Sequence, residues 1–335
     1  MKILIDEAIP FIKGRFPENI ETCYMPGSKI DGKAARDADA LIVRTRTRCD
    51  ESLLKGSNVK LVVSATIGTD HIDTEWCKAN GVTVRNAPGC NAPGVAQYVL
   101  ASLFETGFDA GKHCLGIVGY GHVGSTLAKW ARMMGIKTLI SDAPRQNSGL
   151  RDVDYRPVEE VLRESDAVTL HVPLTKNGDF PTYKMISARE MEMMKPGAWL
   201  VNSSRGGVVD ESAEKEYLKK GKLRGITDVW EKEPVIDLEL FSLLEIATPH
   251  IAGYSAQGKK RATAMALQAL KEELGVETDL KGLECVADDT VIMSPEMILD
   301  TYHPSEDCRQ LRERPSDFEF LRNNYTYRQE PFFSE

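Results

Sequence analysis

Three groups suited to hydride chemistry follow three successive short apolar runs in the second half of the sequence. They are Arg205, Glu233 and His250, which come after the runs at 198–202, 223–229 and 246–248. A guanidinium fork can bind a carboxylate through two parallel hydrogen bonds. A histidine oriented by a carboxylate can take a hydroxyl proton as hydride leaves the adjacent carbon. Each group alone is more often a surface or structural residue, but three of them at successive strand ends predict a catalytic cluster.

A glycine-rich turn, Gly119-Tyr-Gly121-His-Val-Gly124, joins the apolar run 114–118 to a stretch with helical periodicity. The first glycine permits a tight turn, the second lets a pyrophosphate approach the backbone, and the third lets helix and strand pack closely. The N-terminus of the helix then offers free N–H groups to phosphates. Such a turn can also be a plain packing turn, but its position between strand and helix favours dinucleotide binding.

The residue at the end of the next predicted strand distinguishes the two nicotinamide dinucleotides. Asp142 lies 18 residues after Gly124. A carboxylate there can accept hydrogen bonds from the ribose hydroxyls and would repel a 2′-phosphate. The sequence therefore predicts NAD rather than NADP as the cofactor, although Arg145 is close enough to leave NADP open.

The elements that must position these groups alternate along the chain. Short apolar runs lie at 2–6, 40–44, 60–65 and 82–86, and a second series lies at 114–118, 138–140, 167–172, 198–202, 223–229 and 246–248. Mixed stretches that could form helices separate them, so the chain predicts an α/β fold with parallel sheets. Six strands in the second series are typical of a dinucleotide-binding sheet.

The domain boundaries are predicted at the two places where the chain passes between the first and the second domain. The turn-rich stretch 86–94 precedes an apolar helix at 95–104, and a long helix after His250 has one apolar face and would return to the first domain. We expect a discontinuous domain of residues 1–92 and 253–282, a dinucleotide-binding domain of residues 93–252, and a C-terminal segment of residues 283–335. In this segment, Ser316 and Glu319 have the spacing of a capping box on a short amphipathic helix.

The composition describes a globular chain of 335 residues, long enough for two or three domains. Its net charge of −8 would repel polyphosphate, so we expect no nucleic-acid partner. No apolar run approaches membrane-spanning length, and the charged residues at the start predict a first strand rather than a signal peptide. Seven scattered cysteines without a Cys-x-x-Cys pair predict reduced thiols in a cytoplasmic protein, with no zinc or other metal site.

Three arginines alternate after the run at 40–43, at positions 44, 46 and 48. In an extended segment, alternate residues share a face, so Arg44, Arg46 and Arg48 would line up. Such a cluster in an acidic protein would attract a dianion such as a phosphate. A solvated charged edge explains the same spacing equally well.

Four motifs give the sequence a specific resemblance to a known family. They are the glycine turn at 119–124, Asn-Ser-Ser-Arg-Gly at 202–206, Asp-Val-Trp-Glu-Lys-Glu-Pro at 228–234 and Thr-Pro-His-Ile-Ala-Gly at 248–253. Over nearly the whole of residues 1–280, the chain resembles the D-isomer-specific 2-hydroxyacid dehydrogenases. The resemblance implies a Rossmann domain, a flavodoxin-like discontinuous substrate domain and a small C-terminal α+β dimerisation segment.

The resemblance also implies how the site works. Arg205 would anchor the carboxylate of a 2-hydroxy acid, and Glu233 would orient His250, the acid/base in its oxidation by NAD. Contacts to the cofactor would come from Gly119, Gly121, His122, Val123, Gly124, Asp142, Val172, Asp228 and Gly253, with Asp228 near the nicotinamide.

Within the family, the chain best resembles the members that oxidise 4-phospho-D-erythronate to 2-oxo-3-hydroxy-4-phosphobutanoate in pyridoxal 5′-phosphate synthesis. The shared stretches lie at 1–7, 65–73, 86–91, 250–254 and 318–325. The last stretch resembles part of a dimerisation domain, which implies a homodimer. The resemblance places the following residues on the phosphorylated substrate: Arg44, Thr45, Arg46, Thr66 and Tyr254. Thr45 stands where a serine is expected, and either hydroxyl can donate a hydrogen bond.

Three alternatives remain open from the sequence. Another member of the family could act on 3-phosphoglycerate, glyoxylate or hydroxypyruvate. A protein of this fold could instead sense NAD and act as a binding partner, as transcriptional corepressors do, but the added C-terminal segment and the acidic charge disfavour this. A formate-type dehydrogenase is expected to have glutamine in the role of Glu233.

Overall fold

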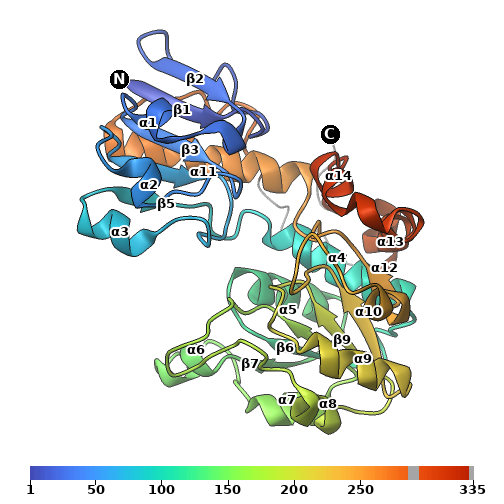
Figure 1. Cartoon of the computed structure of the whole chain (residues 1–335). Helices are drawn as coiled ribbons and strands as arrows, with labels where there is room; N and C mark the ends of the chain where they lie inside the picture. Colours follow the sequence, from blue (N-terminus) through green and yellow to red (C-terminus); the bar gives the residue numbers. More distant parts are fainter. Residues whose placement is uncertain (286–293, 332–335) are drawn as a thin grey trace. The chain divides into compact units, whose positions relative to one another are not determined.

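The computed structural model of the protein describes residues 1–285 and 294–331. These residues form two compact units (Figure 1). Unit 1 contains residues 1–91 and the described residues from 256 to 285, and unit 2 contains residues 92–255 and 294–331. Each unit is built around one parallel β-sheet, which confirms the predicted α/β fold class.

Unit 1 has a five-stranded sheet in the order β2-β1-β3-β4-β5, the flavodoxin-like order. Its strands are β1 (Lys2–Asp6), β2 (Glu21–Met25), β3 (Ala40–Val43), β4 (Leu61–Ser64) and β5 (Thr83–Arg85). Four of them match the predicted apolar runs. Strand β2 was not predicted, because it lies at the edge of the sheet and its mixed polar sequence is only partly buried.

Both faces of this sheet are covered by helices. On one face, Leu41 and Val62 pack with residues of α2 (Glu51–Leu54) and α3 (Thr74–Ala79), and α1 (Gly32–Ala35) joins the same cluster. On the other face, Ile42 and Val63 pack against α11 (Ala256–Leu274). Neighbouring residues of a strand point to opposite faces, which explains the continuous apolar runs. The predicted long helix after His250 is α11, and it belongs to unit 1.

Unit 2 contains a six-stranded sheet in the order β11-β10-β9-β8-β6-β7. Its strands are β6 (Cys114–Val118), β7 (Lys137–Ser141), β8 (Ala167–Leu170), β9 (Ala198–Asn202), β10 (Leu223–Thr227) and β11 (Ile246–Ala247). All six predicted strands are present. The strand order reverses between β6 and β8, and open α/β sheets bind ligands beyond the carboxyl ends of the strands at such a point.

The helices of unit 2 surround this sheet. They are α4 (Ala92–Glu105), α5 (His122–Met133), α6 (Ala143–Asn147), α7 (Val158–Glu164), α8 (Ala188–Met193), α9 (Glu211–Lys219) and α10 (Leu238–Leu243). Almost every residue of α4 from Ala92 to Leu103 is buried, which agrees with the apolar helix predicted there. No helix in residues 1–285 or 294–331 is both long and apolar enough to cross a lipid bilayer.

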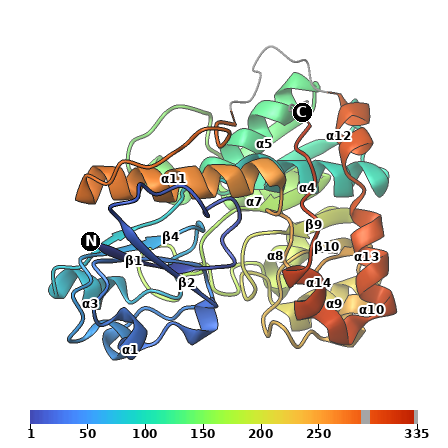
Figure 2. The same ribbon diagram turned by 90° about the horizontal axis from the view of Figure 1, so that it is seen from above.

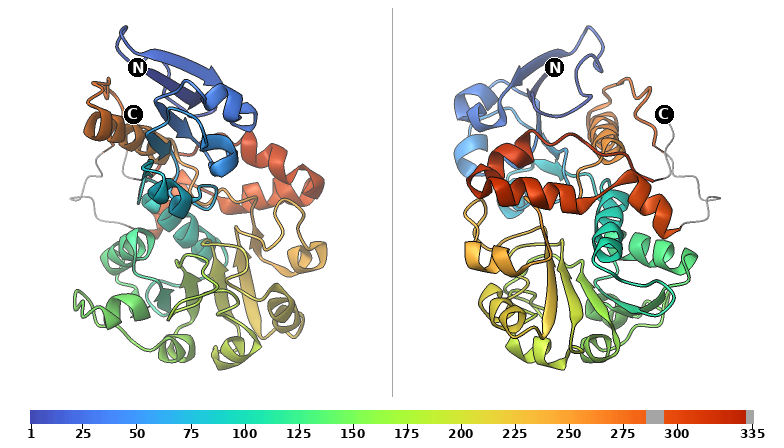
Figure 3. Two further views of the ribbon diagram at one scale, coloured as in Figure 1. Left: turned by 60° about the vertical axis from the view of Figure 1, so that its left-hand side comes forward. Right: turned by 90° about the vertical axis from the view of Figure 1, so that its right-hand side faces the viewer.

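The C-terminal segment forms helices that pack onto unit 2. They are α12 (Pro295–Thr301), α13 (Pro304–Glu313) and α14 (Phe318–Asn323). Helices α12 and α13 contact α4, and α13 also contacts β11 (Figures 2 and 3). Ile298, Leu311 and Phe318 are buried in the core of unit 2. Most of the apolar side chains of α12–α14 therefore face the unit that carries the dinucleotide-binding sheet.

Two expectations for this segment were wrong in residues 294–331. The expected α+β mixture is helical there, and its only extended pairing is an isolated bridge between Ser255 and Arg328. The capping box at Ser316 and Glu319 does not form, because Pro315–Asp317 already makes a 3-10 turn before α14. Ser316 lies inside that turn and its hydroxyl contacts the carboxylate of Asp317 instead.

Candidate active site and cofactor site

The glycine turn after β6 has the geometry that a dinucleotide requires. Gly119 has a φ of +96°, and a Cβ there would collide with the carbonyl oxygen of His171. A Cβ at Gly124 would collide with the carbonyl of Gly119, because α5 packs closely on the turn. At Gly121, in contrast, a Cβ would meet nothing within 4 Å. The first and third glycines are therefore required by packing, whereas the second leaves the backbone open to a ligand.

The residues around this turn complete a cradle for a phosphate-linked ligand. Helix α5 begins at His122 without a side-chain cap, so the N–H groups of its first turn, including that of Val123, face outward. Val172 lies beside the turn, with its Cγ1 3.0 Å from the position of a Cβ on Gly119. These contacts place Val172 at the reversal of strand order, beyond the end of β8.

Asp142 lies at the carboxyl end of β7, on the same edge of the sheet. One oxygen of its carboxylate accepts the N–H of Tyr120 at 2.7 Å, and the other accepts the N–H of Arg145 at 3.0 Å. The guanidinium of Arg145 turns elsewhere, to the Tyr155 hydroxyl at 3.1 Å and the Asp152 carboxylate at 3.1 Å. The negative charge of Asp142 therefore faces the turn, and the site suits a ribose without a 2′-phosphate.

The side chains of His250 and Glu233 form a direct pair. Nδ1 of His250 lies 2.8 Å from one carboxylate oxygen of Glu233 and 3.0 Å from the other. A carboxylate accepts hydrogen bonds, so Nδ1 carries the proton and Nε2 is left to accept one. The side chains are 30% and 19% exposed, so a substrate can reach the imidazole while the carboxylate stays largely shielded.

The charge of Glu233 is stabilised by its neighbours. Burial alone would raise the pKa of this carboxyl, but the hydrogen bond and charge of His250 lower it. The N–H of Trp230, at 3.0 Å, and the charge of Arg322 lower it further. The net effect is a pKa of Glu233 below its ordinary value, so the carboxylate is ionised at neutral pH and can stabilise an imidazolium at His250.

The backbone of His250 is held in an unusual conformation by Asp228. His250 has a φ of +58°, in the left-handed region that costs a non-glycine residue about 1–3 kcal/mol. The Asp228 carboxylate accepts the N–H groups of Ile251 at 2.8 Å and Ala252 at 2.9 Å, and the Thr248 hydroxyl at 2.6 Å. Asp228 is only 1% exposed. It therefore lies beneath the His250 loop and fixes it, a task that the sequence did not indicate.

Arg205 and Glu233 come from adjacent loops of the sheet. A Cβ on Gly206 would collide with the carbonyl of Trp230, so the loop after β9 lies directly against the loop after β10. The indole N–H of Trp230 in turn donates to the carbonyl of Thr248 at 3.1 Å. This chain of contacts joins the three loops that carry Arg205, Glu233 and His250 at one edge of the sheet.

The last two predicted residues of unit 2, Gly253 and Tyr254, lie in the loop that follows His250. Gly253 lies in a turn closed by the N–H of Tyr254, which donates to the carbonyl of Ile251 at 2.8 Å. The ring of Tyr254 packs edge-on against Tyr325 and Tyr327. Among residues 1–285 and 294–331, no group of three or more His, Cys, Asp or Glu side chains is arranged to hold a metal ion.

The remaining predicted substrate residues lie in unit 1. Arg44, Thr45 and Arg46 follow β3, and Thr45 and Arg46 are exposed. Thr66 follows β4, and its hydroxyl contacts the Ser64 hydroxyl at 2.7 Å and the Gly68 carbonyl at 3.3 Å. All four therefore lie beyond the carboxyl ends of two neighbouring strands.

The expected row of three arginines was wrong. Strand β3 ends at Val43, and the N–H of Thr47 returns to the carbonyl of Arg44 in a turn. The turn forms because Thr47 is buried and its hydroxyl donates to the carbonyl of Gly27 at 2.9 Å. Arg44 instead binds the carbonyl of Ala8 at 2.7 Å. The side chain at position 48 pairs with Asp50 at 2.7 Å, so it does not continue the row.

Sequence reasoning missed two arginines of the C-terminal segment. Arg322 lies 3.4 Å from a carboxylate oxygen of Glu233 and 3.4 Å from the Tyr254 hydroxyl. Arg328 is buried and donates to backbone carbonyls of the loop that follows His250. No local pattern could have indicated these contacts. Arg322 does lie within 318–325, the stretch for which the resemblance implied dimerisation.

Comparison with known proteins bears out the predicted family. The sequence model of the D-isomer specific 2-hydroxyacid dehydrogenase, NAD binding domain, matches residues 99–252. Erythronate-4-phosphate dehydrogenase of Bacteroides fragilis is 42% identical over 98% of this chain and 97% of its own length. The enzyme of the same name from Escherichia coli O157:H7 is 38% identical over 98% of this chain and 92% of its own length.

A solved structure agrees with these matches. The NAD+-bound 3-phosphoglycerate dehydrogenase of Entamoeba histolytica aligns with a TM-score of 0.66 and 27% identity, over 84% of this chain and 97% of that one. The relatives with the higher identities match nearly the full length, including the C-terminal segment. The chain therefore belongs to the D-isomer specific 2-hydroxyacid dehydrogenase family.

Proposed function

We propose that the protein oxidises the C2 hydroxyl of 4-phospho-D-erythronate to give 2-oxo-3-hydroxy-4-phosphobutanoate, with NAD as cofactor, in the synthesis of pyridoxal 5′-phosphate. The observation that carries this proposal is the near full-length similarity to erythronate-4-phosphate dehydrogenases. The His250–Glu233 pair supplies the chemistry that such an oxidation needs. The match to an NAD binding domain over residues 99–252 supports the cofactor.

The chain's own residues divide the work of the reaction. Arg205 binds the C1 carboxylate of the substrate through its guanidinium fork. Nε2 of His250 removes the proton from the C2 hydroxyl, and the ionised Glu233 stabilises the imidazolium that results. When bound, NAD supplies the acceptor for the C2 hydride. These roles are supported by the pairing of His250 with Glu233 and by the packing of the Arg205 loop against Trp230.

The cofactor would be held by residues at the carboxyl edge of the unit 2 sheet. They are Gly119, Gly121, His122, Val123, Gly124, Asp142, Val172, Asp228 and Gly253. The open space at Gly121 and the uncapped start of α5 support pyrophosphate binding there. The carboxylate of Asp142 would accept the ribose hydroxyls, since carboxylates have further lone pairs beyond those already used.

The substrate phosphate would be held by unit 1, which we propose to be the substrate domain. Arg44 and Arg46 carry the positive charge, and Thr45 and Thr66 offer hydroxyls. Tyr254 is also among the residues that we propose to contact the substrate. A guanidinium beyond a strand end, in a chain of net charge −8, supports a local anion site.

We propose further that the enzyme acts in the cytoplasm as a homodimer. The seven scattered cysteines, none of them in a Cys-x-x-Cys pair, suit a reducing compartment. The resemblance of residues 318–325 to part of a dimerisation domain supports the dimer. Light scattering coupled to size-exclusion chromatography checks the dimer, and a mass of one chain at all concentrations would contradict it.

The substrate is tested with a panel of 2-hydroxy acids. Purified enzyme with NAD receives 4-phospho-D-erythronate, 3-phosphoglycerate or glycerate, with a 2-oxo acid present to recycle the cofactor. We expect kcat/KM to be highest for 4-phospho-D-erythronate. A higher value for 3-phosphoglycerate would make the enzyme another member of the family, and no turnover of any acid would favour an NAD-sensing role.

A further inference from the structure

The C-terminal segment contacts the His250 loop through two arginines that have different partners. Arg328 binds the backbone of the loop, whereas Arg322 binds the side chains of Glu233 and Tyr254. We propose that Arg322 is a positioning residue of the proposed reaction, which fixes the Glu233 carboxylate against His250 and the Tyr254 hydroxyl beside it. This inference rests on the proposed role of His250 as the base.

Arg328 is the anchor that attaches the segment to unit 2. It is 8% exposed and donates to the carbonyls of Ile251 and Tyr254 at 3.1 Å each, to Gly94 at 2.9 Å, and also to Ala252. Its guanidinium lies over the ring of Tyr302, 4.1 Å from the centroid. Buried carbonyls need donors, so this one side chain satisfies the backbone on both sides of the turn at Gly253.

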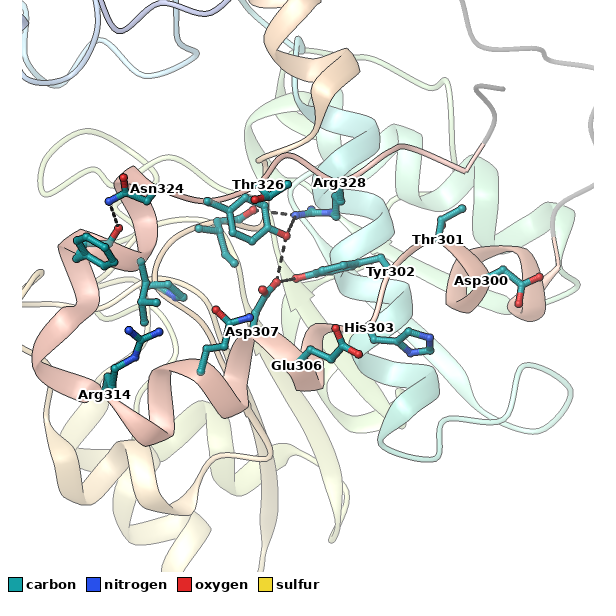
Figure 4. Close-up of a pocket in the computed structure, with 16 residues that line it drawn as sticks. Asp300, Thr301, Tyr302, His303, Glu306, Asp307, Arg314, Asn324, Thr326 and Arg328 are labelled. Atoms are coloured by element: carbon teal, nitrogen blue, oxygen red, sulfur yellow. Dashed lines mark hydrogen bonds between the residues drawn. The ribbon is translucent and has the colours of Figure 1, made fainter. Parts of the chain in front are cut away.

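A cavity of about 440 Å³ lies beside these polar contacts. It lies between the C-terminal helices and the start of the catalytic loop, with Pro249 and Ile251 in its wall (Figure 4). The Tyr302 hydroxyl donates to Asp307 at 2.8 Å, and Figure 4 shows this network reaching Arg328. Phe318 holds the start of α14 in the core of unit 2, and the polar contacts around the cavity add to this packing.

Arg322 extends from α14 to the catalytic pair. Its Nη1 lies 3.4 Å from Oε2 of Glu233, the oxygen that is 2.8 Å from Nδ1 of His250. Its Nε lies 3.4 Å from the hydroxyl of Tyr254. A planar guanidinium with two fixed N–H directions restricts both partners at once. The side chain is 19% exposed, so water screens the contact only partly.

The neighbours of Glu233 and Arg322 explain why both side chains are charged. Glu233 faces His250, Arg322 and the N–H of Trp230, and Arg322 also interacts with Tyr254 and Asp228. Burial alone would lower the pKa of Arg322, but the Tyr254 hydroxyl and the two carboxylates raise it above its ordinary value. Arg322 therefore stays charged and offsets part of the negative charge that Glu233 presents to the imidazole.

The experiment compares Arg322→Met, Arg322→Lys and a matched control, Arg309→Met. Arg309 lies in the same segment and forms an exposed ion pair with Glu313, and such pairs contribute little to stability. For Arg322→Met we expect kcat to fall about tenfold to a hundredfold, the cost of a misplaced catalytic group. NAD affinity and the thermal midpoint should stay close to wild type. Arg322→Lys should recover part of kcat, and Arg309→Met should match wild type.

The ring of His250 supplies a readout that does not depend on turnover. NMR follows the ring signals of the six histidines, and His250→Ala identifies those of His250. In Arg322→Met the Nδ1 proton of His250 should change its chemical shift and exchange faster with water, because the Glu233 carboxylate that accepts it is no longer held by the guanidinium. Unchanged His250 signals would overturn the proposal even if no hydroxy acid were turned over. A fall in kcat that is matched by weaker NAD binding and a lower thermal midpoint would reduce Arg322 to a structural residue.

Discussion

Among single residues, Glu233 and Asp228 differ in how far their carboxylates are exposed and in the groups that they contact. Both are carboxylates that follow β10, but Glu233 faces an imidazole at the surface of the site and Asp228 is 1% exposed beneath it. Asp228 accepts two backbone N–H groups and one hydroxyl, so most of its hydrogen bonds hold the loop. Two acids of one motif therefore have separate positions, one paired with the imidazole of His250 and one beneath the His250 loop.

The proposed base is tested by replacing His250. In His250→Ala, turnover should be lost while NAD binding is largely kept, because the imidazole contributes the proton acceptor and not the cradle. The matched control is His303→Ala, since His303 also pairs with a glutamate, Glu105, at 2.8 Å but lies outside the catalytic cluster. Steady-state kinetics and calorimetric titration with NAD check both variants. Unchanged turnover in His250→Ala would rule out the acid/base role.

A buried carboxyl in α9 gives the fold a pH dependence of its own. Glu214 is 2% exposed, one of its oxygens lacks a hydrogen bond, and burial followed by the charge of Glu211 raises its pKa to about 8. The folded protein therefore keeps a proton that the unfolded chain releases above its ordinary pKa of 4.5. The folded state should lose up to about 1.4 kcal/mol per pH unit from this group between those two values.

The variant Glu214→Gln should remove this dependence. Its free energy of unfolding relative to wild type should increase from pH 5 to pH 8, as measured in urea at several pH values. Glu216→Gln is the matched control, because Glu216 lies on the same helix with 57% of its side chain exposed. A difference from wild type that is the same at both pH values would show that Glu214 is ionised throughout.

At the scale of elements, the turn between β6 and α5 combines packing and binding in one hexapeptide. A Cβ on Gly119 or Gly124 would collide with nearby backbone, whereas a Cβ on Gly121, at the start of the helix, would meet nothing within 4 Å. The same residue type therefore serves two purposes, and substitutions can separate them.

Alanine at position 124 should lower stability, whereas alanine at position 121 should weaken NAD binding. Gly124→Ala should destabilise the protein by about 1–3 kcal/mol, because its Cβ overlaps the Gly119 carbonyl and forces a backbone shift. Gly121→Ala should leave the unfolding midpoint near wild type but weaken NAD binding, since its Cβ occupies the approach of the pyrophosphate. Thermal unfolding and NAD titration measure the two effects. Equal loss of stability in both variants would contradict this assignment.

At the scale of the whole molecule, the C-terminal segment is part of unit 2. Ile298 and Phe318 are buried in its core, and Arg328 binds carbonyls in α4 and in the loop after His250. The segment therefore contributes to the stability of the NAD-binding unit even if it also forms a dimer interface. Its helices α12 and α13 pack against α4, which is far away in the sequence.

Removal of the Arg328 guanidinium should be costly. In Arg328→Met the carbonyls of Gly94, Ile251 and Tyr254 each lose one hydrogen bond, although the Ile251 carbonyl keeps the N–H of Tyr254. A buried group that is left without a partner costs about 1–3 kcal/mol. We expect a clear fall in the urea midpoint and a loss of turnover together. Arg312→Met, which removes a donor from the carbonyl of Leu244, is a milder comparison within α13. A midpoint for Arg328→Met as high as that of Arg309→Met would contradict the anchoring role.

The sequence by itself determined the strand series, the glycine turn and the set of groups that follow the strands. Parallel strands buried on both faces need continuous apolar runs, and their carboxyl ends share one edge, so local patterns were sufficient. The alternating arginines led to a wrong prediction, because residues spaced by two share a face only while the strand continues. Strand β3 stops at Val43, where Thr47 turns inward to Gly27.

The tertiary structure alone decided which distant groups support the catalytic loop. The contacts of Arg322 span 68 and 89 residues, and the contact between Arg328 and Gly94 spans 234. Such contacts depend on how α12–α14 pack onto α4 and not on any local spacing. The same holds for Gly206, whose missing side chain lets two loops meet. Local sequence encodes elements and their ends, whereas the geometry between them is fixed only when the core is packed.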